Sequence, residues 1–450
     1  MVTYRSARLE RLLGAPVAEA QHSHVLGLIA GAVPEDFDLD YKRELYGNGG
    51  SDRRSLCSDV AAMANTAGGL IILGMDEDAH GVAATAPEVD LSDDEKRRML
   101  QIIASGVSPL PQFDVIPIPG GNPDRGFYLI SVLRSPEAPH AVIVNNETLR
   151  FPRRNGSTTV YLTQAEVRAA YLAQFTADGD RAGRIVGLDS ALTVDLDVSE
   201  QTYLVVSLLP DLGGSMNIDT AALQTFQQQV AGRSPFIVGY NGSRWTRGQV
   251  GPGCLTANGS SNPGDKAKWL ACHLHKSGAG VFASAFDRGM PNPMSSAYAD
   301  GPLTNVGDEL LAESLLAGLR FLAAHARDRS GASGNALLRA SIFPVADEVP
   351  ARLIQYRAYS GGDEYGTRRV TVPPSATTVA DIDDLAAEGP ELVAAAYRLG
   401  SELFQAFGIA EIPQMTAAGE FRQRYWLSQA RPTVEAWAKK NGVSMIDEKI

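Results

Sequence analysis

An acidic stretch near the N-terminus holds residue types suited to phosphodiester chemistry. Glu35, Asp40 and Asp76 are carboxylates, and Lys42 follows Asp40 by two positions. Carboxylates that converge can hold a divalent cation, which neutralises a phosphodiester and activates a water, while an adjacent lysine steadies the developing charge. Residues two apart share one face of a strand, so Asp40 and Lys42 should lie side by side. This short spacing is a weak signal by itself.

A strand, a helix and a second strand must position these side chains. Residues 35–42 alternate, so that an extended chain would place Asp36, Asp38, Asp40 and Lys42 on one face and Phe37, Leu39 and Tyr41 on the other. The segment 51–66 predicts a helix with Ser51 as its N-cap and Gly68-Gly69 as its stop. The apolar run 70–75 predicts a strand covered on both faces that leads into Asp76.

The following residues predict the remainder of an N-terminal α/β domain. We expect a helix over 92–105 and a hairpin of strands 113–118 and 126–133. A short strand pair should follow at 141–144 and 148–151, and a helix over 163–175 begins with a capping box. Before the first strand, residues 1–33 predict two short helices that pack on the domain.

The order of these segments resembles the Schlafen AlbA-like domain over about residues 30–173. That family has a glutamate, Glu-Phe-Lys on a strand, a helix ending in Ala-Asn-Thr-x-Gly-Gly, and a strand ending in Gly-Val-Asp. The corresponding residues here are Glu35, Asp40-Tyr41-Lys42, Ala64-Asn65-Thr66-Ala67-Gly68-Gly69 and Gly74-Met75-Asp76. The resemblance continues through Ser108-Pro109, the Ser135-Pro136 turn and the segment Arg153-Arg154-Asn155-Gly156-Ser157.

The resemblance implies a metal-dependent endoribonuclease that acts on structured RNA such as tRNA. In catalytic Schlafen proteins three acids form the cleavage centre, which implies Glu35, Asp40 and Asp76 as ligands of Mg²⁺ or Mn²⁺ and, with Lys42, as catalytic residues. Asp78 is an alternative to Asp76. Asp40 departs from the usual glutamate, and the zinc-binding cluster of animal members has no counterpart near this domain. In many bacterial relatives the same module is regarded as a DNA-binding part.

Basic residues inside the domain are candidates for contacts to a nucleic acid. Arg153, Arg154 and Ser157 suit phosphate contacts, since guanidinium groups and hydroxyls position a backbone. Arg53, Arg54 and Arg150 could extend a local basic patch, although ion pairing with the excess of acids is the alternative. The net charge of −12 argues against a protein that grips nucleic acid through its whole surface. The glycine-rich segment 47–51 could hold a phosphate at a helix N-terminus.

The 450 residues exceed one efficient core, so we expect two or more domains. The predicted architecture is an α/β N-terminal Schlafen AlbA-like domain, residues 1–175, followed by an α+β C-terminal domain, residues 185–450, that could sense a ligand or mediate oligomerisation. The polar segment 176–184 predicts the boundary. No apolar run could span a bilayer and three distant cysteines form no paired spacing, so we expect a soluble cytoplasmic protein.

The C-terminal segment predicts alternating strands and helices. We expect strands at 203–209, 236–240, 267–274, 280–286, 337–343 and 353–359, and helices at 220–230, 308–326, 390–407 and after Pro432. The segment 372–381, rich in Pro, Ser and Thr, predicts a loop or a minor boundary. His273 and His275 share a strand face but lack a third metal ligand nearby.

Three function classes follow from these patterns. The first is a metal-dependent endoribonuclease, as in bacterial proteins that defend against phage. The second is a non-catalytic, DNA-binding transcriptional regulator. The third is a protein-interaction scaffold, an alternative that the acidic balance leaves open. The expected partner is RNA or DNA, with no membrane and a possible homo-oligomer.

Overall fold

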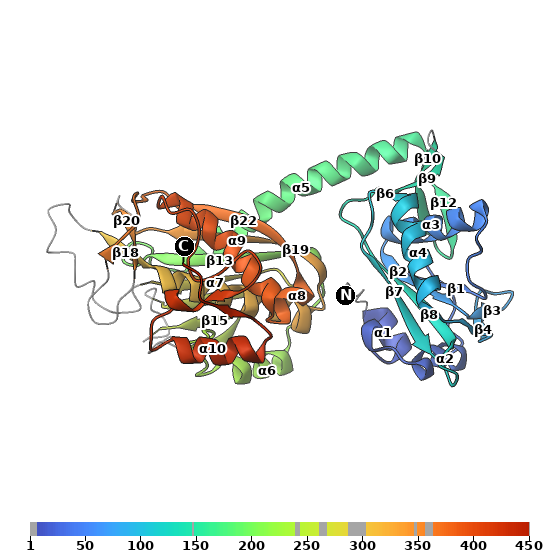
Figure 1. The fold of residues 1–450 in the computed structure, drawn as a ribbon, viewed down its shortest axis with the longest axis horizontal. Helices are drawn as coiled ribbons and strands as arrows, with labels where there is room; N and C mark the ends of the chain where they lie inside the picture. Colours follow the sequence, from blue (N-terminus) through green and yellow to red (C-terminus); the bar gives the residue numbers. More distant parts are fainter. Residues whose placement is uncertain are drawn as a thin grey trace. The chain divides into compact units, whose positions relative to one another are not determined.

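The computed structural model describes residues 7–145, 148–238, 244–260, 268–286, 303–345, 349–355 and 363–449. The chain forms two compact units, Met1–Asp180 and Arg181–Ile450 (Figure 1). Both units combine helices with strands, as the composition and periodicity predict. No helix among the described residues has the length and apolar character needed to cross a membrane.

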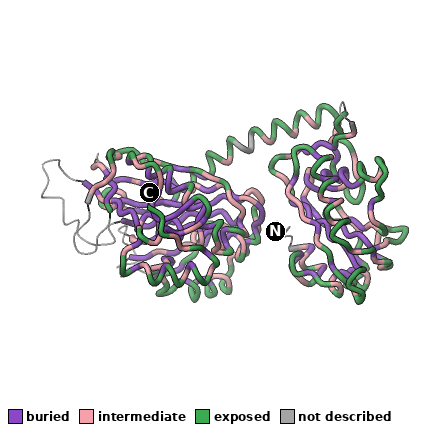
Figure 2. The backbone as a smooth tube through the Cα atoms, viewed as in Figure 1, coloured by how far each residue is buried: buried purple, intermediate pink, exposed green. Residues whose placement is uncertain are grey.

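A five-stranded sheet forms the centre of the N-terminal unit. Its order is β1 (Leu39–Lys42), β2 (Gly68–Leu73), β8 (Arg125–Leu133) and β5 (Val89–Asp90), and β7 (Phe113–Pro119) also pairs with β8. β1 and β2 are parallel, with Asp40 opposite Ile71 and Lys42 opposite Leu73. Every residue of β2 is buried, which confirms the prediction of a strand covered on both faces (Figure 2).

Helices cover this sheet. α3 (Gly50–Ala64) and α4 (Asp93–Gly106) bury Leu56, Val60 and Ile103 in one core with Ile71 and other inward residues of the sheet. α1 (Ala7–Leu13) and α2 (His22–Ala30) are joined by η1 (Val17–Glu19), and the His22 ring lies 5.2 Å from the ring of Phe127 on β8. The two short helices are therefore confirmed.

Three smaller sheets complete the unit. Two of them are β10 (Thr148–Arg150), β9 (Ala141–Asn145) and β6 (Val107–Ser108) in that order, and the hairpin of β11 (Pro152–Asn155) and β12 (Thr158–Tyr161). β3 (Asp76–Glu77) and β4 (Ala83–Thr85) form the third. The strand predicted over 35–42 is shorter than expected, because Asp36 and Leu39 hydrogen-bond across a tight turn and Arg8 binds the carboxylates of Asp36 and Asp38.

One long helix, α5 (Gln164–Thr193), contains the polar segment 176–184. The segment predicted as the boundary is thus helical, and both ends of the helix are held. Thr163 caps the start with Glu166, and Ile185 and Leu192 are buried near the end. In the C-terminal unit Asp189 accepts hydrogen bonds from Ser207 and Ser341. The division between the two units falls inside this helix, after Asp180.

The C-terminal unit is built on a seven-stranded antiparallel sheet. Its order is β14 (Arg247–Gly251), β15 (Cys254–Gly259), β16 (Leu270–His275), β17 (Gly280–Ala285), β13 (Tyr203–Leu212), β19 (Ser333–Phe343) and β22 (Ser375–Asp381). One core joins the sheet to α6 (Thr220–Val230), α7 (Asp308–Ala324), α8 (Ile382–Ala386) and α9 (Pro390–Ala406). A second core joins Leu192 of α5 to β13, β16 and β17.

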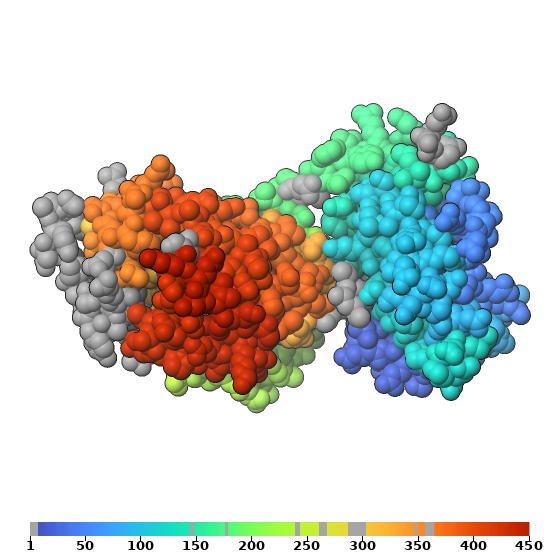
Figure 3. All heavy atoms as spheres, in the orientation of Figure 1, coloured from blue at the N-terminus to red at the C-terminus, as the bar shows by residue number. Residues whose placement is uncertain are grey.

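Smaller elements complete this unit. The strands are β18 (Thr304–Gly307), β20 (Ala351–Gln355), β21 (Asp363–Glu364), β23 (Phe421–Arg422) and β24 (Met445–Ile446). Two short helical segments, η2 (His325–Ser330) and η3 (Gln423–Tyr425), and the helix α10 (Arg431–Lys440) accompany them. On the face seen in Figure 3, residues of the last third of the chain, in orange and red, cover most of the unit.

Several C-terminal predictions need correction. Residues 375–381 form the edge strand β22, so the prediction of a loop or boundary over 372–381 is wrong. Residues 236–238 form no strand, and 239–240 lie outside the described residues. β20 ends at Gln355, and residues 356–359 and 267 of two predicted strands also lie outside them. β14 and β15 are strands that the sequence pattern does not predict.

Candidate functional site

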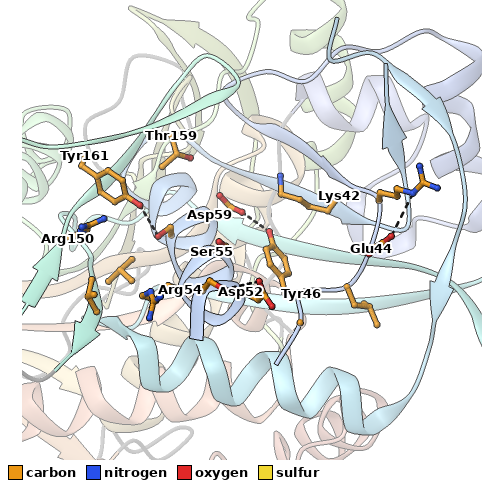
Figure 4. Close-up of a pocket in the computed structure, with 17 residues that line it drawn as sticks. Lys42, Glu44, Tyr46, Asp52, Arg54, Ser55, Asp59, Arg150, Thr159 and Tyr161 are labelled. Atoms are coloured by element: carbon orange, nitrogen blue, oxygen red, sulfur yellow. Dashed lines mark hydrogen bonds and ion pairs between the residues drawn. The ribbon is translucent and has the colours of Figure 1, made fainter. Parts of the chain in front are cut away.

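A pocket of about 1370 Å³ lies in the N-terminal unit (Figure 4). Its lining comes from the end of β1, the loop 43–47, the first turns of α3, and strands β9, β10 and β12. The side chains are mostly polar and include four cations and three acids: Lys42, Arg43, Arg54, Arg150, Glu44, Asp52 and Asp59. This size exceeds the roughly 300–1,000 Å³ of typical small-molecule sites.

The end of α3 ties the strands of the pocket together. The Asn65 amide donates to the carbonyl oxygens of His140 (2.9 Å) and Pro152 (2.8 Å), and its oxygen accepts from the His140 backbone N–H (2.7 Å). The Thr66 hydroxyl accepts from the Arg154 backbone N–H (2.9 Å). A side chain on Gly69 would collide with the Asp38 carbonyl oxygen, 2.6 Å from where its Cβ would lie. The Ala-Asn-Thr-x-Gly-Gly segment therefore holds the end of α3 to the segments that begin at residues 140 and 152.

Asp40 lies beneath the pocket at the centre of a buried ionic cluster. Its side chain is 2 % exposed, and its two carboxylate oxygens bind different cations. Lys42 Nζ contacts Oδ2, and Arg154 Nη2 lies 2.9 Å from Oδ1. Burial lowers the pKa of Lys42, but the negative charges of Asp40 and Asp59 outweigh it and the net pKa is raised. Lys42 is thus a charged ammonium at the pocket wall.

Asp59 extends this cluster into the pocket. The Tyr46 hydroxyl donates to its carboxylate at 2.7 Å. Burial, followed by the negative charge of Asp40, raises the pKa of Asp59, while Lys42 acts in the opposite direction. The cluster formed by Asp40, Lys42, Arg154, Asp59 and Tyr46, named here the ionic cluster, therefore joins the pocket to the interior.

Arg54 and Arg150 lie on the exposed side of the pocket. The Arg150 guanidinium lies over the ring of Tyr161, 5.4 Å from its centroid. The Tyr161 hydroxyl lies 3.5 Å from the Ser58 hydroxyl on α3. Figure 4 shows Tyr161 and Arg150 beside the first turns of α3, near Arg54. Sequence reasoning named Arg150 only as part of a local basic patch and missed Tyr161 and Asp59. Tyr161 reaches the pocket from the hairpin of β11 and β12, and Asp59 from α3.

Residues 35–162 match the family model described as "Schlafen, AlbA_2". This segment is a Schlafen AlbA-like domain. The match confirms the resemblance derived from the acidic and glycine motifs, and it places the AlbA-like domain in a nucleic-acid-binding family.

Two further comparisons add little to this assignment. A comparison with curated proteins finds no match. Among solved structures, the DIP2311 protein from Corynebacterium diphtheriae is 20 % identical with a TM-score of 0.23. That similarity covers 36 % of this chain and 28 % of the other. The chain therefore spans little more than a quarter of the length of that protein.

Glu35 of the AlbA-like domain is a half-buried acid with an altered proton affinity. Its carboxylate accepts from the Tyr41 backbone N–H at 2.6 Å. Burial raises the pKa of Glu35 to about 8, and the negative charge of Asp40 and a hydrogen bond with Glu77 add to the shift. Glu35 therefore holds its proton at neutral pH.

The third predicted acid points elsewhere. Asp76 binds Arg43 at 2.9 Å, and the exposed Asp78 accepts the backbone N–H groups of His80 and Val82, which lowers its pKa. Glu77 lies between them in sequence and is the acid beside Glu35. Strand alternation, which separates Glu77 from both neighbours, is the signal that could have found it.

The predicted ligands do not fit a Mg²⁺ or Mn²⁺ centre in this arrangement. Both Asp40 oxygens have cationic partners, and the Asp76 carboxylate binds Arg43. Within the described ranges, no group of three or more His, Cys, Asp or Glu side chains is placed to hold a metal ion. Asp40 and Asp76 are thus engaged in separate ion pairs, and Glu35 accepts a backbone N–H.

The predicted phosphate contacts fall into two sets. Arg54 is exposed and lines the pocket, whereas Arg53, Arg153 and Ser157 are exposed but do not line it. Arg154 is 4 % exposed and binds Asp40, so it offers no surface to a phosphate. We therefore reassign Arg154 to the ionic cluster.

The helix N-terminus at Gly47–Ser51 is not an open phosphate cradle. The Asp52 carboxylate folds back over this loop and occupies the space where a Cβ of Gly47 would lie. Because a carboxylate already faces the first turn of α3, a phosphate there would meet a like charge. Phosphate contacts in the pocket therefore fall to the arginines.

Proposed function

We propose that the AlbA-like domain binds nucleic acid in this pocket, with Arg54 and Arg150 as its phosphate contacts. The observation that carries the proposal is the difference between these arginines and the other cations of the pocket. Lys42 and Arg43 are held by Asp40 and Asp76. In the described part of the chain, neither Arg54 nor Arg150 has an ion-pair partner, and both are exposed. Guanidinium groups with free donors suit phosphate oxygens.

Because the chain carries a net negative charge, we expect the contact with nucleic acid to be confined to this pocket. With a net charge of −12, attraction to a polyanion must come from a few cations rather than from the whole surface. Two phosphate contacts predict a modest salt dependence, with log K falling against log[salt] at a slope of about −1.4 for a single strand or −1.8 for B-DNA.

The geometry favours the hypothesis that the domain binds nucleic acid without metal-dependent cleavage. An endoribonuclease that cuts tRNA in defence would need acids that share a cation, and the three predicted acids are each bound to other groups. The arrangement supports a role closer to that of a non-catalytic, DNA-binding regulator.

Anisotropy titrations of the full chain test this proposal, using fluorescent tRNA and a fluorescent DNA duplex over a series of salt concentrations. Arg54→Ala and Arg150→Ala should each weaken binding and lower the magnitude of the salt slope by about 0.7–0.9. Arg97→Ala is the matched control, because Arg97 is exposed on α4, pairs with Asp94 and does not line the pocket.

Two results would overturn the proposal. If both pocket variants bind like the unmodified chain, the phosphates lie elsewhere. If Mn²⁺ supports cleavage of tRNA that EDTA and Asp40→Asn each abolish, the acids act as a metal site after all and the endoribonuclease is restored.

A further inference from the structure

We infer that the pocket takes a single-stranded segment and stacks one unpaired base on the ring of Tyr161. This inference rests on the proposed function and names the class of nucleic acid that the same site accepts. It begins from an aromatic side chain that keeps 47 % of its surface exposed although it lines a pocket.

The Tyr161 ring is held in place before any ligand arrives. Strand alternation in β12 directs Thr159 and Tyr161 into the pocket, and both belong to its lining. The hydroxyl lies 3.5 Å from the Ser58 hydroxyl, and the Arg150 guanidinium covers one face of the ring. Tyr161 stays 47 % exposed with these contacts made, so part of the ring is open to a ligand, and a fixed ring loses little entropy on binding.

A base is the ligand that fits an open aromatic face beside free guanidinium groups. Proteins that bind single strands combine aromatic rings, on which bases stack, with cations that follow the phosphates. Here Arg150 is placed for both roles, because it touches the ring and is a phosphate contact of the proposed function. Arg54 on α3 supplies a second cation in the same pocket.

A duplex can contact the arginines through its phosphates but offers no base to the ring of Tyr161. Its bases are stacked on their neighbours, so no face is free for a protein ring unless the base leaves the helix. A free nucleotide is also a poor match, because the pocket of about 1370 Å³ is larger than sites for small molecules. Single-stranded segments and unpaired loops remain as the class that the geometry favours.

The test compares a fluorescent 12-nucleotide strand, as DNA and as RNA, with the same strand annealed to its complement. The full chain should bind either single strand more tightly than the duplex. Tyr161→Ala should weaken single-strand binding roughly 5- to 150-fold, the range for loss of one stacked base, and leave duplex binding unchanged. Tyr161→Phe, which keeps the ring, should bind within about twofold. Phe175→Ala is the control, because Phe175 is 70 % exposed and does not line the pocket.

A second probe tests stacking without changing the protein. Strands with one abasic position, moved along the 12-mer, should bind the unmodified chain less tightly, and Tyr161→Ala should bind them as it binds the intact strand. Equal binding of abasic and intact strands by the unmodified chain overturns the inference, even if Tyr161→Ala fails to fold.

The two proposals fail in different ways. If Arg54→Ala weakens binding but Tyr161→Ala does not, or if the duplex binds as tightly as the single strand, stacking is wrong and phosphate binding in the pocket stands. If neither arginine variant alters binding to any strand, the proposed function itself is wrong and the inference falls with it.

Discussion

The two units of the chain bury their charged groups in different ways. In the C-terminal unit, two buried acids accept backbone donors from distant segments: Glu309 accepts the Leu427 N–H at 2.7 Å, and Glu313 accepts the Val238 N–H at 3.1 Å. In the N-terminal unit, Asp40, Lys42, Arg154 and Asp59 gather in the ionic cluster beneath a pocket. Buried acids that accept backbone N–H groups stabilise the fold. A cluster of charged side chains that lines a pocket instead indicates a functional site.

Breaking the ionic cluster is the largest effect that this comparison predicts. Asp40→Ala leaves the Arg154 guanidinium buried without its carboxylate, because the Arg154 side chain is only 2 % exposed. Loss of one partner of a buried ion pair costs about 3–5 kcal/mol of unfolding free energy. Denaturant titration followed by a probe in the N-terminal unit measures the loss.

Asp189 provides the matched comparison in the C-terminal unit. It is equally buried, but its partner Arg339 is 19 % exposed and can turn to water. Asp189→Ala should therefore cost less, about 1–3 kcal/mol. The double variant Asp40→Leu, Arg154→Met should recover much of the stability, since removing both charges leaves neither unsatisfied. Equal losses for Asp40→Ala and Asp189→Ala would contradict a special role for the ionic cluster.

Single titrating groups in the two units should respond to pH with opposite signs. His325 of the C-terminal unit is fully buried, and burial lowers its pKa to about 3. The unfolded chain takes up this proton near pH 6.5 and the folded chain only near pH 3. The contribution of His325 is therefore complete above pH 6.5 and is lost as pH falls, by at most about 1.4 kcal/mol per unit.

Glu35 of the N-terminal unit behaves in the reverse direction. Its pKa is raised to about 8, so the folded chain keeps a proton that the unfolded chain loses near pH 4.5. Its contribution is present in acid and is lost as pH rises towards 8, with a smaller slope because the side chain is half exposed. Unfolding curves of Glu35→Gln and His325→Gln, each subtracted from the parent across pH 3–8, measure the two slopes. Slopes of the same sign would contradict this prediction.

Much of the N-terminal fold could be predicted because its signals are local. The helix predicted over 92–105 is α4, and Ser92, its predicted first residue, is the N-cap that accepts the Glu95 N–H at 3.1 Å. The alternation of Asp40 and Lys42 correctly places them together. The family motif around Asn65 could be recognised by its letters. Its physical role could not, because the side chain binds residues 75 and 87 positions away.

The pocket itself depended on pairings that no local pattern encodes. Arg153 and Arg154 look equivalent in sequence, but β11 alternates, so Arg154 turns inward opposite Thr159 while Arg153 faces outward. Arg150 meets Tyr161 only because two strands of different sheets approach one another. The partners of the predicted acids are also distant in sequence or unmarked by a local pattern: Asp76 binds Arg43, and Asp40 binds Arg154.

The smallest predicted effect concerns the acid that weakens the pocket. Asp52 lines it and lies over the loop that opens α3, where its charge repels a bound phosphate. Asp52→Asn keeps the shape and removes the charge, so affinity for a single strand should rise roughly 2- to 5-fold at low salt, in line with about 1 kcal/mol for unit charges 4 Å apart in water. Asp124→Asn, in the exposed turn between β7 and β8, is the control. Because screening weakens an exposed charge, the gain should fade as salt rises. A gain that persists at high salt, or a loss of affinity, would show that Asp52 organises the loop rather than repels the ligand. The affinity of the pocket would then not depend on the charge that Asp52 places near the bound phosphate.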